Sequence, residues 1–304
     1  MLLIREETRG AALVFASAVL WSLGGAIAGL LTISDSWAVV FWRSIFSATF
    51  LTAFMLWRNG WNNMKQMFAT IGFAGVGVAL CIATASSMFV VALKFTSVAN
   101  ILLIQAGVPL FAALMAYLLF HEPIKRSTWL AIAAVIVGVF IMVSGSGTSR
   151  TSALGNGLAL VVAVAFASAT VITRRQSKVK MLPAACLGFL FAAIGAATLA
   201  VSLLINAADA ALLLLFGACT LGLGMVLWVT GVPLINTALA ALLGTTETVL
   251  GPIWMWLMHG QMPAARTLIG GSVVFLALLT HLTWEACTQK HLLGDSASRP
   301  ASTL

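Results

Sequence analysis

Residues 10–31 read GAALVFASAVLWSLGGAIAGLL and contain no charged side chain. An α-helix rises about 1.5 Å per residue, so about 20 apolar residues are enough to cross the roughly 30 Å hydrocarbon core of a bilayer. The run is longer than the core of a secretory signal peptide, which has about 7–15 residues, and it lacks a clear cleavage site. We therefore expect this stretch to remain in the protein as a membrane span.

Nine further apolar runs follow the first one, and charged, polar or proline residues separate them. The ten predicted spans cover residues 10–31, 36–57, 67–92, 97–119, 127–144, 153–173, 183–205, 209–229, 236–258 and 264–283. Of the 304 residues, 61% are hydrophobic and 8% are charged, whereas soluble domains have roughly 45–50% and 25%. This composition excludes a soluble globular protein.

The basic residues are unevenly distributed over the predicted connections. If the N-terminus is cytoplasmic, twelve Lys and Arg residues lie in cytoplasmic segments and three lie on the opposite side, while Arg43 lies within a span. Basic residues in short loops favour the cytoplasm. We therefore expect a multi-pass protein of a bacterial-type inner membrane with both termini cytoplasmic. The excess of basic residues is assigned to this orientation and not to nucleic-acid binding.

Five spans in each half give the two halves opposite orientations in the membrane. The predicted fold class is an all-α integral membrane protein of ten transmembrane helices, arranged as two inverted five-helix repeats. The first repeat covers residues 1–146, the second covers 151–288, and 289–304 are expected to form a disordered cytoplasmic tail. Inverted repeats are common in secondary transporters, whose substrate site lies near the bilayer midplane between the repeats.

Several short motifs follow one another at characteristic positions. They are Trp21-Ser-Leu-Gly24, Arg43, Ser97-Val-Ala-Asn100, Leu118-Leu-Phe-His-Glu122, Arg174-Arg175 and Glu247-Thr-Val-Leu-Gly-Pro252. In this order and spacing the chain resembles the EamA-type branch of the drug/metabolite transporter superfamily over nearly its whole length. Thr248, His121 and Gln261 depart from the family pattern. The resemblance implies ten helices in two repeats, and it favours export of a small molecule.

Glu247 and Arg43 are the two ionisable residues expected deep within spans. Such side chains are costly in hydrocarbon, by about 2.5–3.5 kcal/mol on insertion scales, and usually face a cavity or a partner. Glu247 lies near the middle of the ninth span and is a candidate for reversible protonation or for contact with a cationic substrate group. A structural carboxyl between helices is the alternative. Arg43 either extends to the membrane surface or pairs with Glu247 or the substrate.

Polar residues of the third, fourth, eighth and ninth spans are candidates to line a central path. They are Thr84, Ser87, Asn100, Gln105, Thr220, Thr245 and Thr246. Hydrogen bonding between packed helices is the alternative role for each of them. Trp21 and Trp228 are candidates to stack on a planar or cationic substrate, although many membrane tryptophans lie at the interfaces.

The sequence predicts a secondary active transporter that works by alternating access and exchanges its substrate for protons. An uptake permease, a uniporter and a membrane-embedded enzyme are the alternatives. No phosphate-binding loop of the form G-x-x-x-x-G-K-[ST] occurs, and His121-Glu122 lacks the second histidine of a zinc peptidase motif. We expect no cofactor, no metal and no enzymatic activity. The expected partners are a small amino-acid-like or cationic/aromatic substrate, protons and membrane lipid, with the protein a monomer or homodimer.

Overall fold

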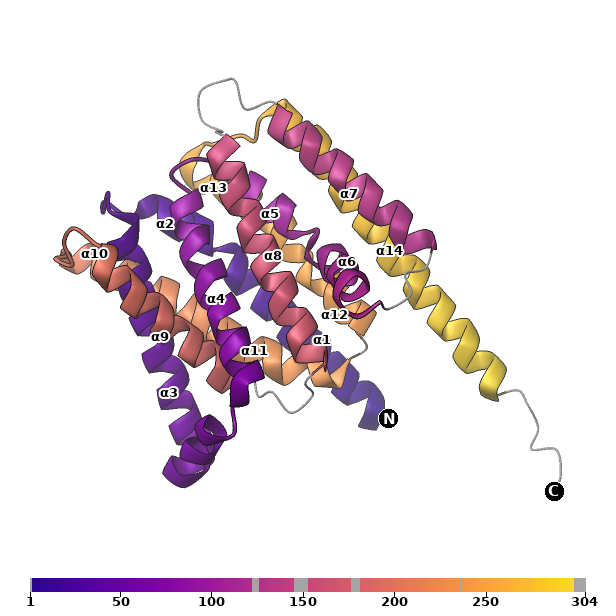
Figure 1. Ribbon diagram of the computed structural model, residues 1–304, viewed down its shortest axis with the longest axis horizontal. Helices are drawn as coiled ribbons and strands as arrows, with labels where there is room; N and C mark the ends of the chain where they lie inside the picture. The colour runs from indigo at the N-terminus through magenta and orange to yellow at the C-terminus, as the bar shows by residue number, and fades with distance from the viewer. Residues whose placement is uncertain (1, 122–125, 145–152, 176–180, 236, 298–304) are drawn as a thin grey trace.

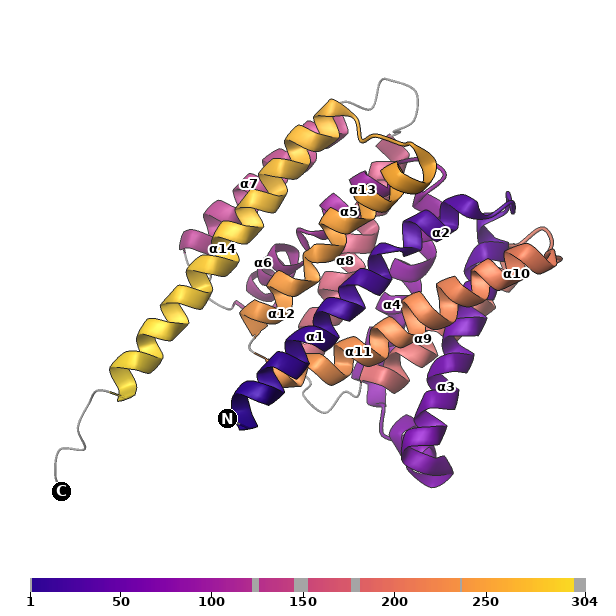
Figure 2. The same ribbon diagram turned by 180° about the vertical axis from the view of Figure 1, so that it is seen from behind.

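The structure is a computed structural model that describes residues 2–121, 126–144, 153–175, 181–235 and 237–297. These residues form helices joined by short turns, and none of them lies in a strand. Most of the helices pack into one bundle. The helices α7 (Arg126–Ser144) and α14 (Ala265–Ala297) lie side by side along one edge of it (Figures 1 and 2).

The other helices of the first half are α1 (Leu2–Ser22), α2 (Gly24–Leu30), α3 (Ser36–Ala69), α4 (Gly72–Ala92), α5 (Val98–Gln105) and α6 (Val108–Phe120). Those of the second half are α8 (Ala153–Arg175), α9 (Met181–Leu199), α10 (Ala207–Leu214), the π-helix η1 (Leu215–Leu223), α11 (Gly224–Gly231), the 3-10 turn η2 (Val232–Leu234), α12 (Thr237–Gly244) and α13 (Thr246–His259).

Several helical stretches are long and apolar enough to cross a membrane. Six stretches meet this requirement on their own: Glu6–Leu30, Ser36–Ala69, Gly72–Ala92, Ala153–Arg175, Met181–Leu199 and Ala207–Leu234. The helices α5 and α6, bent by 44° at their junction, together form a seventh candidate, and two shorter apolar stretches lie in α7 and α14. The chain is therefore a multi-pass membrane protein, and the count of ten spans stays a prediction.

Three predicted spans are broken near their middles. The first is interrupted at Leu23 between α1 and α2, the fourth at residues 106–107 between α5 and α6, and the ninth at Thr245 between α12 and α13. Pro109 at the start of α6 has no backbone N–H and cannot continue the hydrogen bonding of α5. These interruptions are not visible in the apolar runs, because apolar composition reports length and not backbone continuity.

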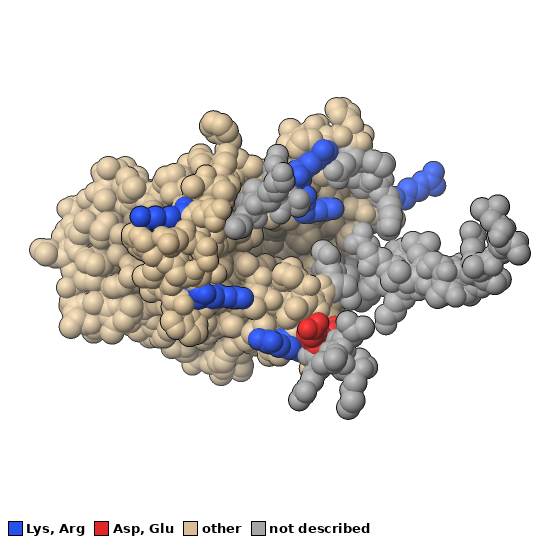
Figure 3. All heavy atoms as spheres, turned by 90° about the horizontal axis from the view of Figure 1, so that it is seen from below, with Lys and Arg blue, Asp and Glu red and all other residues tan. Residues whose placement is uncertain are grey.

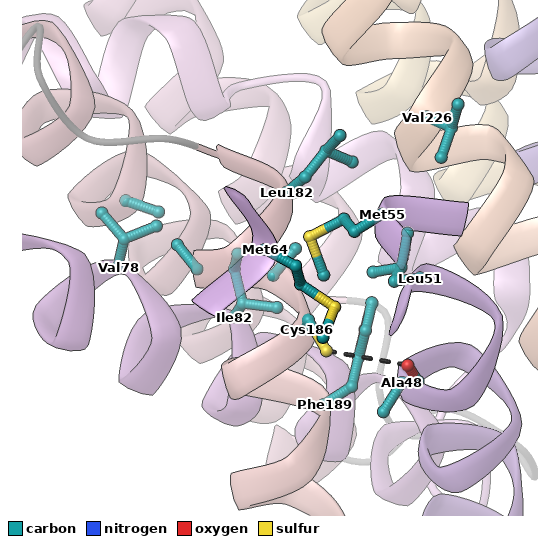
Figure 4. Packing of buried hydrophobic residues seen from close by; sticks show 13 residues of the cluster. Ala48, Leu51, Met55, Met64, Val78, Ile82, Leu182, Cys186, Phe189 and Val226 are labelled. Atoms are coloured by element: carbon teal, nitrogen blue, oxygen red, sulfur yellow. Dashed lines mark hydrogen bonds between the residues drawn. The ribbon is translucent and has the colours of Figure 1, made fainter. Parts of the chain in front are cut away.

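The largest apolar cluster combines helices of both halves. It includes Leu51 and Met55 of α3, Val78 of α4, Phe189 of α9 and Val226 of α11 (Figure 4). Helices α3 and α4 of the first half therefore share one core with α9 and α11 of the second. The two repeats are interleaved and do not form separate packing units.

Basic side chains gather on the face of the molecule seen from below in Figure 3. The beginnings of α1 and α7 and the ends of α3 and α8 lie toward this side in Figure 1. These helix ends carry Arg9, Arg126, Arg58, Lys65, Arg174 and Arg175. Lys94 follows the opposite end of α4, and Arg266 lies at the opposite edge, where α14 begins. The two sides of the molecule therefore differ in basic charge, and the orientation of the chain in the membrane stays a prediction.

The last helix is longer than the sequence analysis expected. Helix α14 extends to Ala297, so residues 289–297 of the expected disordered tail are helical, while 298–304 lie outside the described residues. Helix-forming residues such as Gln289, Lys290 and Leu292 allow the helix to continue beyond the apolar run.

Candidate functional site

The breaks in the fourth and ninth spans lie at the same level of the bundle. Gly251 of α13 lies against Leu102 of α5, and Met255 packs in one cluster with Val98. From the first contact to the second, the residue number rises by four in α13 and falls by four in α5. The two helices are therefore antiparallel. The same register places Glu247 level with residues 105–106, where α5 ends. The end of α5 and the beginning of α13 therefore meet.

Glu247 belongs to the first turn of α13, and its side chain is half-buried. The free N–H groups and the dipole at a helix N-terminus favour a negative charge nearby. In many transporters such half-helix ends, formed where a span is interrupted, contact substrate or coupling ions near the midplane. The break in the ninth span thus gives Glu247 surroundings that a continuous helix would not provide.

Gln105 is the last residue of α5, and its Oε1 atom is buried. This oxygen has no hydrogen-bond partner within the described part of the protein. Buried polar atoms are almost always paired, so an unpaired amide oxygen at a helix break is available to a ligand or water. Gln105 and Glu247 are the two sequence-predicted residues that the helix register brings to one level.

Trp21 and Trp228 extend this site with an aromatic pair. Their ring centroids are 5.3 Å apart and the ring planes are inclined by 37°. The six-membered ring of Trp228 approaches Gly244 so closely that a Cβ built there would lie 3.3 Å from it. Gly244 ends α12, immediately before the break that carries Glu247. The two tryptophans therefore lie next to the interrupted ninth span.

The hydroxyl residues are dispersed around this region. Thr245 donates to the Leu242 carbonyl at 2.6 Å, and the Thr220 hydroxyl donates to the Phe216 carbonyl within η1. Thr246 lies next to Glu247 and is half-buried, Ser87 is buried on α4, and Thr84 is exposed on α4. Of this group, the chain positions of Thr245 and Thr246 place them at the break.

Asn100 has a different environment from Gln105. Its Nδ2 donates to Thr96 Oγ1 at 3.1 Å and to Asn156 Oδ1 at 3.2 Å, and its Oδ1 accepts from Thr267 Oγ1 at 2.6 Å. The amide thus connects α5, α8 and α14. These bonds support the packing role that the sequence analysis kept as an alternative. Asn156 and Thr267 were not singled out, because a single polar residue in an apolar run does not reveal its partner.

Arg43 does not extend to the membrane surface. Its side chain is buried, and Nη2 donates to the carbonyl and the hydroxyl oxygen of Ser86, both at 2.6 Å. The guanidinium lies over the ring of Phe216, 4.7 Å from its centroid. These partners hold Arg43 between α3, α4 and η1, and it forms no bond with Glu247. Of the alternatives predicted for Arg43, extension to the membrane surface therefore does not occur, and the side chain is buried and hydrogen-bonded within the bundle.

A second polar cluster joins the connection between α2 and α3 to the connection between α9 and α10 and to the first turn of α10. Asp35 Oδ2 accepts from the Val201 N–H at 2.8 Å. In the opposite direction across the cluster, Asp209 accepts from the Thr32 N–H at 2.9 Å and from the Thr32 hydroxyl at 2.6 Å. This cluster was not predicted from the sequence, although Asp35 before Ser36 is a helix N-cap signal.

A multi-pass helical bundle with interrupted spans and polar groups at the breaks is typical of membrane transporters. Residues 8–144 and 153–283 each match the model of the EamA-like transporter family. The chain belongs to this family, and it is a membrane transporter of the drug/metabolite transporter superfamily with one EamA repeat in each half.

Comparison with known proteins adds evidence for the fold. No curated protein matches the sequence. A solved structure described only as "Crystal structure of protein" has 16% sequence identity and a TM-score of 0.62, over 89% of this chain and 95% of that chain. At this identity the similarity concerns the arrangement of helices alone.

Proposed function

We propose that this protein is a secondary active transporter that exports a small amino-acid-like or cationic/aromatic molecule across a bacterial-type inner membrane in exchange for protons. Ten spans with both termini cytoplasmic provide the framework. The observation that carries the proposal is the meeting of two interrupted helices, where Glu247 and Gln105 lie at one level beside the Trp21–Trp228 pair.

The residues at the break suggest how the substrate is held. A cationic group gains from a negatively charged carboxylate such as Glu247 and from the faces of tryptophan rings, where cation–π attraction contributes about 0.5–2 kcal/mol. The unpaired oxygen of Gln105 is an acceptor for an N–H or O–H donor of the substrate. Together these groups favour a small molecule that has a positive charge and a planar apolar part.

Proton coupling follows from competition for Glu247. The carboxylate binds either a proton or the cationic group, and exchange requires that both do not occupy it together. A proton taken up from one side displaces the substrate, and a new substrate displaces the proton on the other side. The interrupted helices allow the ends near Glu247 to move without breaking a continuous hydrogen-bond ladder.

The test is substrate flux in proteoliposomes with and without an imposed pH gradient. A thermal-stabilisation screen over amino acids, nucleosides and cationic drugs first identifies a labelled substrate. The Glu247→Gln variant keeps the size of the side chain but cannot release a proton, so we expect it to lose gradient-driven flux. Glu6→Gln at an exposed position is the matched control and should keep it.

Equal gradient-driven flux in wild type and Glu247→Gln would remove the coupling hypothesis and leave a carrier. Flux that ignores the gradient in both proteins would indicate a uniporter. Gradient-driven accumulation of substrate on the cytoplasmic side of the protein would instead indicate an uptake permease.

A further inference from the structure

The connection between the second and third predicted spans is a short helix with its own direction. Helix α3 is interrupted at Gly60, whose φ of 73° and ψ of 168° are not helical, and it resumes over residues 61–69. A second glycine with positive φ, Gly72 at 61°, is the first residue of α4. Both angles favour glycine because other L-residues rarely adopt them. Figures 1 and 2 show this segment at the lower edge of the molecule.

The segment 61–69 is amphipathic. Met64 is buried in the large apolar cluster, and Met67 and Phe68 pack against the same cluster. This spacing of three and four residues places the apolar side chains on one face of the helix. The other residues from Trp61 to Gln66 are exposed. The short helix is therefore fixed to the bundle by one face and presents the other outward.

Large aromatic side chains surround this outward face, and more than half of the surface of each is exposed. Trp57 is 83% exposed, Trp61 is 55% exposed and Phe73 is 98% exposed. Tryptophans are enriched where a membrane protein passes from hydrocarbon to headgroups, because the ring is apolar and its N–H is polar. Two exposed tryptophans of α3, with the exposed Phe73 at the start of α4, indicate the level of the membrane interface.

Two basic residues accompany these aromatic rings. Arg58 follows Trp57 directly, and Lys65 Nζ lies over the Trp61 ring, 4.9 Å from its centroid. Residues 57–73 contain no aspartate or glutamate, so the positive charge of this segment has no acidic residue within it. Positive charge beside exposed indoles is complementary to the negative phosphates of lipid headgroups.

We propose that residues 57–73 form a binding site for anionic phospholipid headgroups on the basic side of the membrane. The phosphate lies between Arg58 and Lys65, while Trp57, Trp61 and Phe73 contact the glycerol and upper acyl region. The Gly60 turn orients the helix along the interface, and Met64 packs it against the core shared by α3, α4 and α9. This site is separate from the proposed transport site at the helix breaks.

The test is native mass spectrometry of the full-length protein in neutral detergent, titrated with phosphatidylglycerol or with phosphatidylcholine of the same acyl chains. We expect wild type to retain phosphatidylglycerol preferentially. The double substitution Arg58→Gln and Lys65→Gln should weaken that binding by about 25-fold, since each basic residue near a headgroup contributes about fivefold. Trp57→Leu with Trp61→Leu should weaken both lipids while keeping the preference for phosphatidylglycerol.

The matched control is Arg9→Gln with Arg126→Gln, which removes two exposed positive charges elsewhere on the same side. Far-UV circular dichroism and the thermal midpoint confirm that each variant is folded. The proposal is overturned if wild type binds both lipids equally. It is also overturned if the control pair weakens phosphatidylglycerol binding as much as the Arg58 and Lys65 pair does.

Discussion

The indole rings of Trp21 and Trp228 are in contact, with centroids 5.3 Å apart. One residue comes from the first half of the chain and the other from the second. The indole of Trp21 also lies directly against Gly224 in α11. This aromatic contact therefore joins the two repeats next to the break in the ninth span.

A double-mutant cycle tests the contact between the two tryptophans. We expect Trp21→Ala and Trp228→Ala to be non-additive in the free energy of unfolding by about 0.5–1.5 kcal/mol, the range for an aromatic pair. Reversible unfolding in mixed detergent micelles measures the three variants. Trp57 is 83% exposed, so Trp57→Ala combined with Trp21→Ala is the additive control. Additivity in both cycles would contradict the contact.

Gly217 tests the close packing of η1 on α3. A Cβ at this position would collide with the Arg43 carbonyl oxygen, and the Phe46 Cβ is 2.8 Å away. We expect Gly217→Ala to reduce the free energy of unfolding by about 1–3 kcal/mol, as overpacking does. The control is Gly195→Ala in α9, where no atom lies within 4 Å. There the added methyl group should leave stability unchanged or raise it by up to about 1 kcal/mol.

The lowered pKa of the Asp35 carboxyl leads us to expect that the stability of the protein depends on pH. Burial acts to raise the pKa of this carboxyl, but the Val201 and Trp37 N–H groups and Lys94 outweigh it, so the pKa lies below 3.8. A carboxyl with a lowered folded-state pKa contributes stability above its unfolded pKa and loses it as the pH falls through the folded value. We therefore expect wild type to exceed Asp35→Asn in thermal midpoint by the same margin from pH 8 to about pH 5.

That margin should shrink below about pH 4 as the Asp35 carboxyl takes up a proton. Asparagine is also a good N-cap, so the substitution removes the charge and keeps the cap of α3. A margin that stays constant, or grows, in acid would contradict the assignment. Measurements in the same buffer series on Glu6→Gln control for general effects of charge.

The network around Asn100 predicts a loss of stability without a loss of substrate affinity. Thr267→Val removes one interhelical hydrogen bond and should cost about 0.6–1.7 kcal/mol. Asn100→Ala removes three bonds and leaves Asn156 Oδ1 with the Thr96 hydroxyl as its remaining donor, so its cost should be larger. Thr84→Val at an exposed position is the control. A change in substrate affinity for Asn100→Ala, with unchanged stability, would assign Asn100 to the transport site instead.

Much of the architecture could be predicted from sequence because the bilayer imposes simple rules. A chain with 61% hydrophobic residues and recurring apolar runs must form membrane helices. The family resemblance stated from Trp21, Arg43 and Glu247 in their order is confirmed by the match of both repeats. The uneven distribution of Lys and Arg likewise predicted the basic face seen in Figure 3.

Other features could not be predicted, since they depend on which side chains meet across helices. Hydropathy gave no sign that Arg43 would bond Ser86, because residues 43 positions apart meet only through the packing of α3 on α4. The breaks at residues 106–107 and at Thr245 were equally hidden in apolar runs. Pro109 was a visible signal for the first of them.

The sequence by itself determined that this protein lies in the membrane, and it predicted two halves of opposite orientation. These properties follow from composition, run length and loop charge, each of which can be read along the chain. Only the tertiary structure decided that Gln105 and Glu247 lie at one level of the bundle, at two helix ends, while Asn100 and Arg43 are held by other helices. Burial drives side chains such as Asn100 and Arg43 to find partners, and the identity of each partner is a property of the packed bundle.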